Sequence, residues 1–376
     1  MKKYNKKNQK FIDTLYEIFL PKGYPTSVTG DYLEYQFWDS LQAFASSMNG
    51  ALATQAILKG VGVGNEKATA LAATITWLLK DGSGMIGRIL FAWKKGTDLD
   101  RYSKTWRLLA DILNDISFFI DIFSSWITYY PLFFSFLCFS SILKSIVGVA
   151  GGVTRTVVVQ HQAIKDNIAD VSAKDGSQET LLNLVSLISS LMLLPLVHEN
   201  EILIWISFVI LTFIHLFSNY NAVKSLKFSV FNQETYHIVV KEYINGNLQN
   251  LNINFINKEE PLFKSHITKK RYLGYNLNND IAKKEKYLSY EGKDYTIFYQ
   301  ENEIFINFKE TSTVTSEFHA LFVLEYYLQT NEYPKNSSFD NFIHELQINK
   351  WNLTRHHFAI EKNDDDVKDC FILTGA

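Results

Sequence analysis

Long uncharged stretches, separated by short charged breaks, dominate the chain up to about residue 223. The clearest of these stretches cover residues 40–58, 122–143, 180–197 and 202–223. Each is close to the roughly 20 apolar residues that a helix needs to cross a bilayer. The last two predict a helical hairpin across the turn at 198–201. The whole pattern predicts helices at 36–58, 66–92, 105–127, 128–150, 178–198 and 201–218.

From about residue 224 the pattern changes. Asn, Lys, Glu and Tyr become frequent, and the apolar runs shrink to the length of a strand. Three such runs lie at 237–240, 295–299 and 304–308. Residues 318–328 instead repeat their apolar positions with the period of a helix. This half therefore predicts a soluble α+β domain over 224–376, with the boundary near 218–226.

The expected fold class is mainly α: an N-terminal, membrane-embedded bundle of about six helices over 19–220, followed by the α+β domain. A soluble bundle with apolar inner helices remains an alternative. Asp111, Asp115 and Asp121 interrupt the third predicted helix, and the mean hydropathy of the chain is only −0.06. The hairpin of 180–197 and 202–217 favours membrane insertion.

Composition removes several classes of protein. The 37 basic and 39 acidic residues give a net charge of −2, so no overall field attracts nucleic acid. Two cysteines, Cys138 and Cys370, exclude a disulfide framework and a cysteine-rich zinc site. No standard catalytic motif is present. Residues 1–18 form a basic tail with five lysines, which is either solvated or a positive flank that contacts anionic lipid.

Carboxylates and arginines in the helical half form the first group of candidate site residues. Asp81 and Arg88 belong to the segment KDGSGMIGR and could pair across a turn. Asp111 and Asp115 share one face of a predicted helix. Three carboxylates on an apolar helix are costly unless they are paired or wetted, with Arg88, Arg107 and Arg155 as plausible partners. They therefore indicate either a polar site that lines a cavity or a set of structural salt bridges.

A second group of polar residues lies within 144–180, between apolar helices. Its candidates are Arg155, His161, Asn167, Asp170, Lys174 and Gln178. Asp175-Gly176 predicts a turn before the next helix, as Asp31 predicts a cap for the first. Arg155 and Lys174 beside a helix start could bind an anion such as a phosphate. A lone His161 is more typical of a hydrogen-bonded structural histidine than of a metal ligand.

Four segments together resemble the root UVB-sensitive family. They are 19–40 (FLPKGYPTSVTGDYLEYQFWDS), 80–92 (KDGSGMIGRILFA), 106–115 (WRLLADILND) and 144–180 (KSIVGVAGG through SAKDGSQET). Their order and spacing match over about 19–220, and the texture is closest to the animal and protist members. The resemblance implies a membrane protein linked to vitamin B6 homeostasis and photoprotection. No enzymatic activity is established for the family, so no catalytic residue can be transferred to this chain.

These observations lead to a non-enzymatic, membrane-associated adaptor or carrier-like protein acting in vitamin B6 homeostasis. Pyridoxal phosphate is the expected ligand, and no metal ligand or nucleic acid is expected. Membrane lipid and a homo-oligomer or a hetero-oligomer with a related family member are the expected partners, in an intracellular membrane whose organelle stays open. Alternatives are a half-size major-facilitator-like transporter working as a dimer, a soluble ligand-binding bundle, and an enzyme using Asp111, Asp115 and His161.

Overall fold

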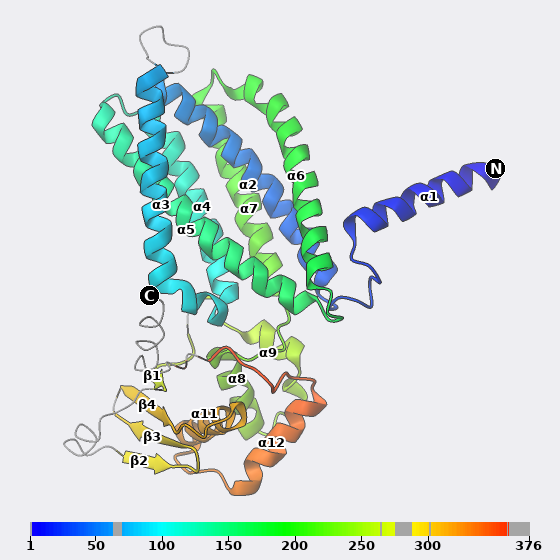
Figure 1. The fold of residues 1–376 in the computed structure, drawn as a ribbon, viewed down its shortest axis with the longest axis vertical. Helices are drawn as coiled ribbons and strands as arrows, with labels where there is room; N and C mark the ends of the chain where they lie inside the picture. The colour runs from blue at the N-terminus through cyan, green and yellow to red at the C-terminus, as the bar shows by residue number, and fades with distance from the viewer. Residues whose placement is uncertain are drawn as a thin grey trace, which may run out of the picture. The chain divides into compact units, whose positions relative to one another are not determined.

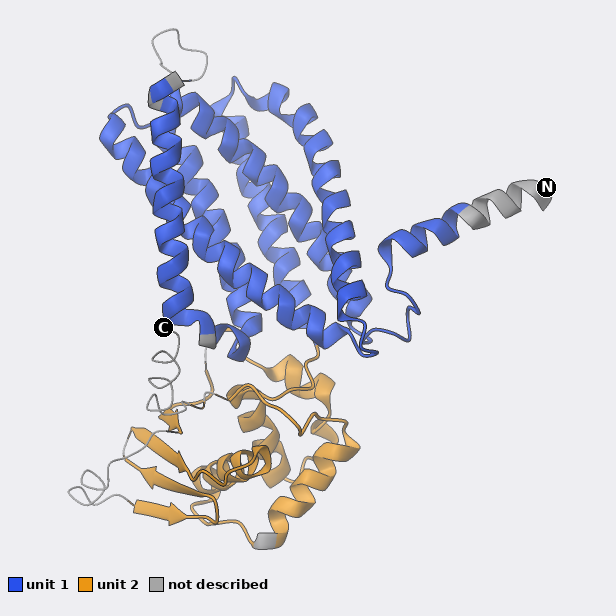
Figure 2. Cartoon of the chain, viewed as in Figure 1, with its two compact units in different colours: residues 1–226 blue, residues 227–376 orange. Residues whose placement is uncertain are grey.

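The computed structural model divides the chain into two compact units, Met1–Leu226 and Lys227–Ala376 (Figures 1 and 2). It describes residues 2–62, 70–263, 265–274, 288–300, 302–358 and 360. The first unit is helical, and the second combines helices with a small sheet. A mainly helical chain with a C-terminal α+β part is therefore confirmed.

Six long helices run side by side in the first unit, preceded by a separate helix at the N-terminus (Figure 1). The helices are α1 (Lys2–Phe19), α2 (Tyr32–Val61), α3 (Ala70–Arg101), α4 (Ser103–Ser124), α5 (Tyr130–Gln162), α6 (Ile168–Val197) and α7 (Glu201–Ser225). The six predicted helices correspond to α2–α7, although all of them except α4 are longer than predicted. The basic tail predicted for residues 1–18 is a helix, α1.

Two glycine-containing segments that were predicted as turns lie inside helices. Residues 80–88 belong to α3, so Asp81 and Arg88 do not face each other across a turn, and Asp81 pairs with Lys80 at 3.4 Å instead. Gly84 lets α3 approach α5 closely, because a Cβ atom there would lie 2.6 Å from Ser141 Oγ. Glycine at this position therefore serves helix packing.

The predicted turn at Asp175-Gly176 is also wrong, because both residues lie within α6. The break between α5 and α6 comes earlier, at residues 163–167. There Ala163 pairs with Val28 in an isolated antiparallel bridge, and Gln162 O accepts a hydrogen bond from Thr29 N at 3.1 Å. The chain thus turns where the segment before α2 packs against it.

The helical unit exposes many large apolar side chains and buries many small or polar ones, beside buried apolar clusters such as Ile57, Phe133 and Leu137. The buried residues of α6 are Val171, Asp175, Ser186, Ser190 and Val197, whereas Leu191 and Met192 are 66 % and 70 % exposed. Only 17 % of the most apolar stretch of α6 is buried, and the same holds for α7. A soluble bundle would bury these stretches.

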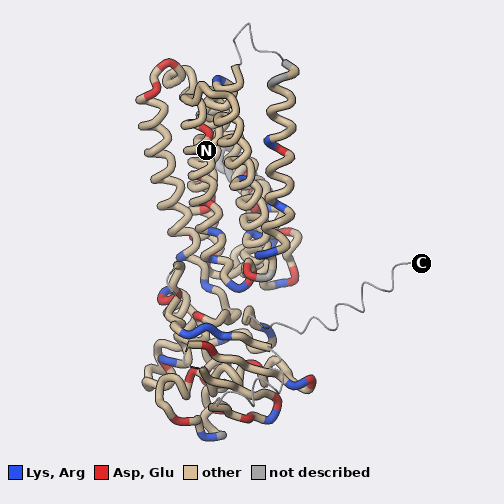
Figure 3. The backbone as a smooth tube through the Cα atoms, turned by 90° about the vertical axis from the view of Figure 1, so that its left-hand side faces the viewer, with Lys and Arg blue, Asp and Glu red and all other residues tan. Residues whose placement is uncertain are grey.

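Among the described residues, three helices are long and apolar enough to cross a membrane: α5, α6 and α7. The expectation of about six spans is therefore not confirmed. Charged side chains within α3 and α4, such as Lys80, Asp111 and Asp115, lower their apolar character. Figure 3 shows that the first unit is nevertheless free of charge over most of its helical length, whereas charged residues are spread over the second.

The second unit contains a four-stranded sheet in the order β1-β4-β3-β2. Its elements are α8 (Gln233–Ile244), the short 3-10 helix η1 (Leu248–Asn250), α9 (Ile253–Glu259), β1 (Lys270–Leu273), β2 (Leu288–Glu291), β3 (Tyr295–Tyr299), β4 (Glu303–Phe308), α11 (Val314–Thr330) and α12 (Asn336–Ile348). β1 and β4 are parallel, and the other pairs are antiparallel.

The apolar runs at 295–299 and 304–308 are strands, as predicted, but the run at 237–240 lies in α8. α8 begins at Gln233 because Asn232 and Thr235 form a capping box at its N-terminus. A buried core joins the sheet to the helices, with Ile297 and Ile306 from the strands and Phe322 from α11 among its members. The second unit therefore has a hydrophobic core of its own.

Candidate functional site

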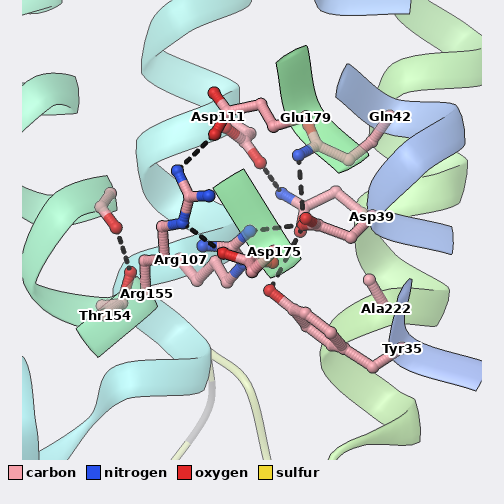
Figure 4. A network of polar contacts seen from close by, with 12 residues as sticks. Tyr35, Asp39, Gln42, Arg107, Asp111, Thr154, Arg155, Asp175, Glu179 and Ala222 are labelled. Atoms are coloured by element: carbon pink, nitrogen blue, oxygen red, sulfur yellow. Dashed lines mark hydrogen bonds and ion pairs between the residues drawn. The ribbon is translucent and has the colours of Figure 1, made fainter. Parts of the chain in front are cut away.

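Polar side chains of α2, α4 and α7 meet inside the helical unit and form what we call the interior polar layer. Figure 4 shows the part of it contributed by α2 and α4. Its members are Tyr35, Asp39 and Gln42 of α2, Arg107, Asp111 and Asp115 of α4, and His215 and Asn219 of α7. The residues from each helix are three or four positions apart, so each set lies on one helix face. The sequence thus prepares three polar faces, and packing brings them together.

Asp39 is the centre of one half of the interior polar layer. It forms an ion pair with Arg107, and it accepts hydrogen bonds from Tyr35 Oη and Gln42 Nε2, each at 3.2 Å. The Arg107 guanidinium also lies 5.5 Å from the centre of the Tyr35 ring. Arg107 is therefore fixed between a carboxylate and an aromatic ring, and both contacts favour its positive charge.

His215 is the centre of the other half and has no exposed surface. Its Nδ1 lies 2.8 Å from Asp115 Oδ2, and its Nε2 lies 2.9 Å from Gln42 Oε1. One turn further along α7, Asn219 Nδ2 donates to Asp111 Oδ2 at 2.5 Å. Two polar contacts, one helical turn apart, therefore connect α7 to α4.

Negative groups outnumber positive groups in the interior polar layer. Three carboxylates face one guanidinium and one imidazole. Within the described part of the chain, Asp115 Oδ1 and Asn219 Oδ1 are buried and accept no hydrogen bond. The layer can therefore accept further hydrogen bonds or positive charge from a bound group.

A second polar cluster joins α2, α5 and α6, also shown in Figure 4. Arg155 Nε donates to Asp175 Oδ2 at 2.5 Å, and its other end pairs with Glu179. Gln36 Nε2 donates to Asp175 Oδ1 at 3.1 Å. Two carboxylates already face Arg155, so the predicted phosphate contact at this residue has no support in the geometry.

The three arginines that were expected to pair with the carboxylates of α4 contact residues of other helices. Arg107 pairs with Asp39 of α2, and Arg155 pairs with acidic residues of α6. Arg88 is exposed, and its guanidinium lies beside Gly148 of α5. Asp121, the last carboxylate of α4, is instead paired with Lys144. Each of these contacts joins two different helices, and the Arg107–Asp39 pair joins helices that are not consecutive in the sequence.

Most of the remaining predicted residues hold the segment of residues 20–31, here called the strap, together with the end of α1. Two contacts hold the strap: Asp170 Oδ2 accepts a hydrogen bond from Lys22 N at 2.7 Å, and Asn167 Nδ2 donates to Ser27 O at 3.2 Å. Two more hold the end of α1: Gln178 Nε2 donates to Phe19 O at 2.6 Å, and Lys174 Nζ donates to Glu17 O at 2.5 Å. His161 contacts Asp31 at 2.8 Å. Asp31 is the N-cap residue of α2, as predicted, but its side chain makes no capping hydrogen bond.

A cavity of about 790 Å³ lies between the end of α1, the strap and α6, and we call it the strap cavity. Its lining includes two basic residues, Lys22 and Lys174, and two acidic residues, Glu17 and Asp170. Tyr16 and Tyr24 supply aromatic surface. A different cavity of about 380 Å³ lies between α2, α4 and α7 and is lined by Lys59, Trp126, His198, Glu201 and Trp205, among others.

Sequence reasoning missed the partners of the predicted carboxylates. Asp39, Gln42 and Asn219 gave no signal of their own, because none of them stands out from the ordinary polar residues around it, such as Ser40 and Ser218. His215 did give a signal, since an ionisable group inside an apolar helix is by default a candidate for function. The histidine beside Asp115 is His215, whereas His161 contacts Asp31, so the predicted acid–base set of Asp111, Asp115 and His161 is not assembled.

Comparison with known proteins finds relatives that all carry the names of one family. RUS family member 1 of Dictyostelium discoideum is 50 % identical over 247 residues, which are 64 % of this chain and 46 % of that protein. Protein root UVB sensitive 3 of Arabidopsis thaliana is 41 % identical over 232 residues (61 % and 51 %). Protein root UVB sensitive 2, chloroplastic, of the same plant is 26 % identical over 239 residues (63 % and 53 %). The chain spans about half the length of these relatives, and no solved structure matches it.

The sequence model of the vitamin B6 photo-protection and homoeostasis domain matches residues 5–247. This match is longer than the resemblance over 19–220. It includes most of α1, and it continues beyond the end of the helical unit through α8. The match covers well over half of the chain, and so this protein belongs to the family that carries the vitamin B6 photo-protection and homoeostasis domain, the root UVB sensitive family.

Proposed function

We propose that the helical unit is embedded in a membrane and that the protein acts there, without catalysing a reaction, in vitamin B6 homeostasis. The reversed polarity of the bundle carries this proposal. In α7, His215 and Asn219 have no exposed surface, whereas Ile202 is 70 % and Phe213 is 69 % exposed. Lipid is the solvent that suits large apolar side chains outside and polar groups inside. The role in vitamin B6 homeostasis follows from the description of the family's domain.

Alkaline carbonate extraction of membranes from cells that express the chain tests the first part. We expect both the full-length chain and a truncation after Leu226 to stay in the pellet, because the apolar helices α5–α7 belong to the first unit. Residues 227–376 alone, which have their own core, serve as the soluble control. Recovery of the full-length chain in the supernatant would contradict membrane insertion.

The strap cavity is the proposed site for a phosphorylated B6 vitamer, with pyridoxal phosphate as the ligand. Its volume lies within the range of about 300–1,000 Å³ that is usual for small-molecule sites. Lys22 and Lys174 supply positive charge for a phosphate. Tyr16 and Tyr24 offer ring faces to an aromatic heterocycle, and Asp170 offers an acceptor for a ring N–H group.

Titration of the purified chain with pyridoxal phosphate tests this site. Lys174→Gln keeps a donor for the Glu17 carbonyl and removes the charge, so we expect binding to weaken roughly 10- to 100-fold, as for loss of one charged hydrogen bond. Lys165→Gln is the matched control: it makes the same change on the adjacent α5–α6 connection, where Lys165 Nζ contacts Thr26. Equal binding by wild type and Lys174→Gln would rule out this site.

A carrier is favoured over an adaptor by one observation, the interior polar layer. Charged groups within a membrane bundle are costly and typically mark a route or a binding site for a polar solute. A unit of six long helices would act as half of a twelve-helix carrier, and hence as a dimer. Uptake of a vitamer into liposomes, together with a cross-linked dimer, would support a carrier; a reconstituted chain that binds but does not take up the vitamer would support an adaptor.

A further inference from the structure

α1 is amphipathic, and over residues 11–18 its apolar side chains are exposed. Phe11, Leu15 and Ile18 follow one another along one ridge, and they are 64 %, 39 % and 44 % exposed. Ile12 and Tyr16 form the neighbouring ridge at 43 % and 58 % exposure. At about 100° per residue, these two ridges make a continuous apolar half of the helix.

The polar half of α1 combines acidic and hydroxyl groups with a run of lysines. Asp13, Thr14 and Glu17 fall outside the apolar half by the same helical period. The five lysines of the helix are at positions 2, 3, 6, 7 and 10, all in its first half. They directly precede residues 11–18 in the sequence, so positive charge adjoins the apolar half of the helix. A helix of this kind matches an interface between apolar chains and anionic headgroups.

The contacts of α1 to the bundle are made near its end. Lys174 Nζ reaches Glu17 O, and Gln178 Nε2 reaches Phe19 O. Residues 11–18 are all exposed. In Figure 1, α1 projects away from the helices of the bundle, joined to them through the strap. The bundle therefore leaves the apolar half of α1 available to another surface.

We propose that α1 lies on the membrane as an interfacial helix that binds anionic phospholipid, with its apolar half among the acyl chains and its lysines against the headgroups. The proposal rests on the proposed membrane location of the helical unit. Charge complementarity, together with the proposed membrane location, selects the occupant: each lysine near an anionic leaflet adds attraction. Tyr16 and Glu17 line the strap cavity, so binding of α1 to lipid also fixes one wall of that cavity.

The test uses the full-length chain, reconstituted in vesicles that contain brominated phosphatidylcholine, with or without phosphatidylserine. Cys138→Ser and Cys370→Ser remove the native thiols, and a fluorophore is attached to a single cysteine at Leu15 or at Asp13, on opposite sides of α1. We expect bromine to quench the label at position 15 when phosphatidylserine is present, and to leave the label at position 13 largely unquenched.

The lysines provide the matched pair of variants. Replacement of Lys3, Lys6, Lys7 and Lys10 by Arg is expected to preserve quenching at position 15, and their replacement by Gln is expected to abolish it. Equal quenching at positions 13 and 15, no quenching at either, or quenching that does not depend on phosphatidylserine would overturn the proposal. Shielding at position 15 that depends on protein concentration would indicate a second copy of the chain and would overturn it as well.

A label at Leu191 separates this outcome from failure of the membrane proposal. Leu191 lies on the exposed apolar side of α6. If the bundle is embedded, this label is quenched in both kinds of vesicle. Quenching at position 191 without quenching at position 15 would overturn the interfacial helix alone, whereas no quenching at position 191 would overturn the membrane location itself.

Discussion

Replacement of Arg107 by leucine is expected to lower the free energy of unfolding of the helical unit by about 3–5 kcal/mol, as is usual when one partner of a buried ion pair is removed. Arg107 is the cation that pairs with Asp39, and the carboxylates of Asp111 and Asp115 lie on the same face of α4. Without the guanidinium, Asp39 keeps only the hydrogen bonds from Tyr35 and Gln42. Thermal unfolding of the detergent-solubilised chain measures the loss.

Two controls separate the loss of this ion pair from a general effect of substitution. The double variant Asp39→Leu and Arg107→Leu removes both charges and is expected to recover a large part of the stability. Lys59→Leu breaks an exposed pair with Glu201, whose side chains are 63 % and 54 % exposed, and such pairs contribute at most about 1 kcal/mol. Equal effects of Arg107→Leu and Lys59→Leu would contradict a structural role of the interior polar layer.

Replacement of Arg271 by methionine is expected to destabilise the second unit by about 3–5 kcal/mol at neutral pH. Arg271 of β1 pairs with Glu325 of α11, and their side chains are 4 % and 1 % exposed. His237 of α8 contacts the other oxygen of Glu325 at 2.7 Å. The variant therefore leaves a buried carboxylate with a single partner. Hydrogen–deuterium exchange of peptides from β1 and α11 in the full-length chain locates the effect in this unit.

The buried carboxylate of Glu325 also makes the stability of the second unit depend on pH. Burial by itself raises the pKa of Glu325, but the charge of Arg271 and the hydrogen bonds from His237 and Arg271 outweigh burial, and the pKa lies below its ordinary value. That ordinary value is about 4.3 in an unfolded chain. Between the two pKa values the unfolded state binds more protons than the folded state. The stabilisation is therefore complete above about pH 4.3 and is lost as the pH falls through the folded pKa.

Substitution of Glu325 by glutamine is the control for this pH dependence. It removes the titrating group, so the contribution of Glu325 to acid unfolding is expected to disappear. In Arg271→Met the carboxylate can be protonated in place, so the difference from wild type is expected to be largest near neutral pH and to shrink towards pH 4. An unchanged acid-unfolding midpoint in Glu325→Gln would show that Glu325 does not contribute to acid stability.

The helical half of the fold could be predicted from the sequence because its signals are local. Of the four uncharged runs, three lie within single helices (40–58 in α2, 180–197 in α6 and 202–223 in α7), whereas 122–143 covers the end of α4 and the start of α5. The ends of the helices were less predictable. Gly84 and Gly176 look like turn residues in isolation, yet both lie inside helices. Gly84 packs against α5, and the sequence alone does not show such a contact.

The candidate site was predictable only in part, for a related reason. Helical spacing placed Asp111 and Asp115 on one face, and the run of polar residues near 155–178 marked a junction. Most partners of these residues come from positions about 70 to 160 residues away, as with Arg107 and Asp39 or Gln178 and Phe19. Such pairs depend on which helix faces come together, and a single sequence contains no direct record of that choice.

The sequence by itself determined the family, the mainly helical first half, the strands at 295–299 and 304–308, and the presence of ionisable groups within apolar helices. Each of these follows from local order or periodicity along the chain. Only the tertiary structure decided that the apolar side chains of α6 and α7 face outward and that Asp39, Arg107 and His215 share one interior layer. The physical reason is that a helical period specifies a face, whereas packing specifies what that face meets.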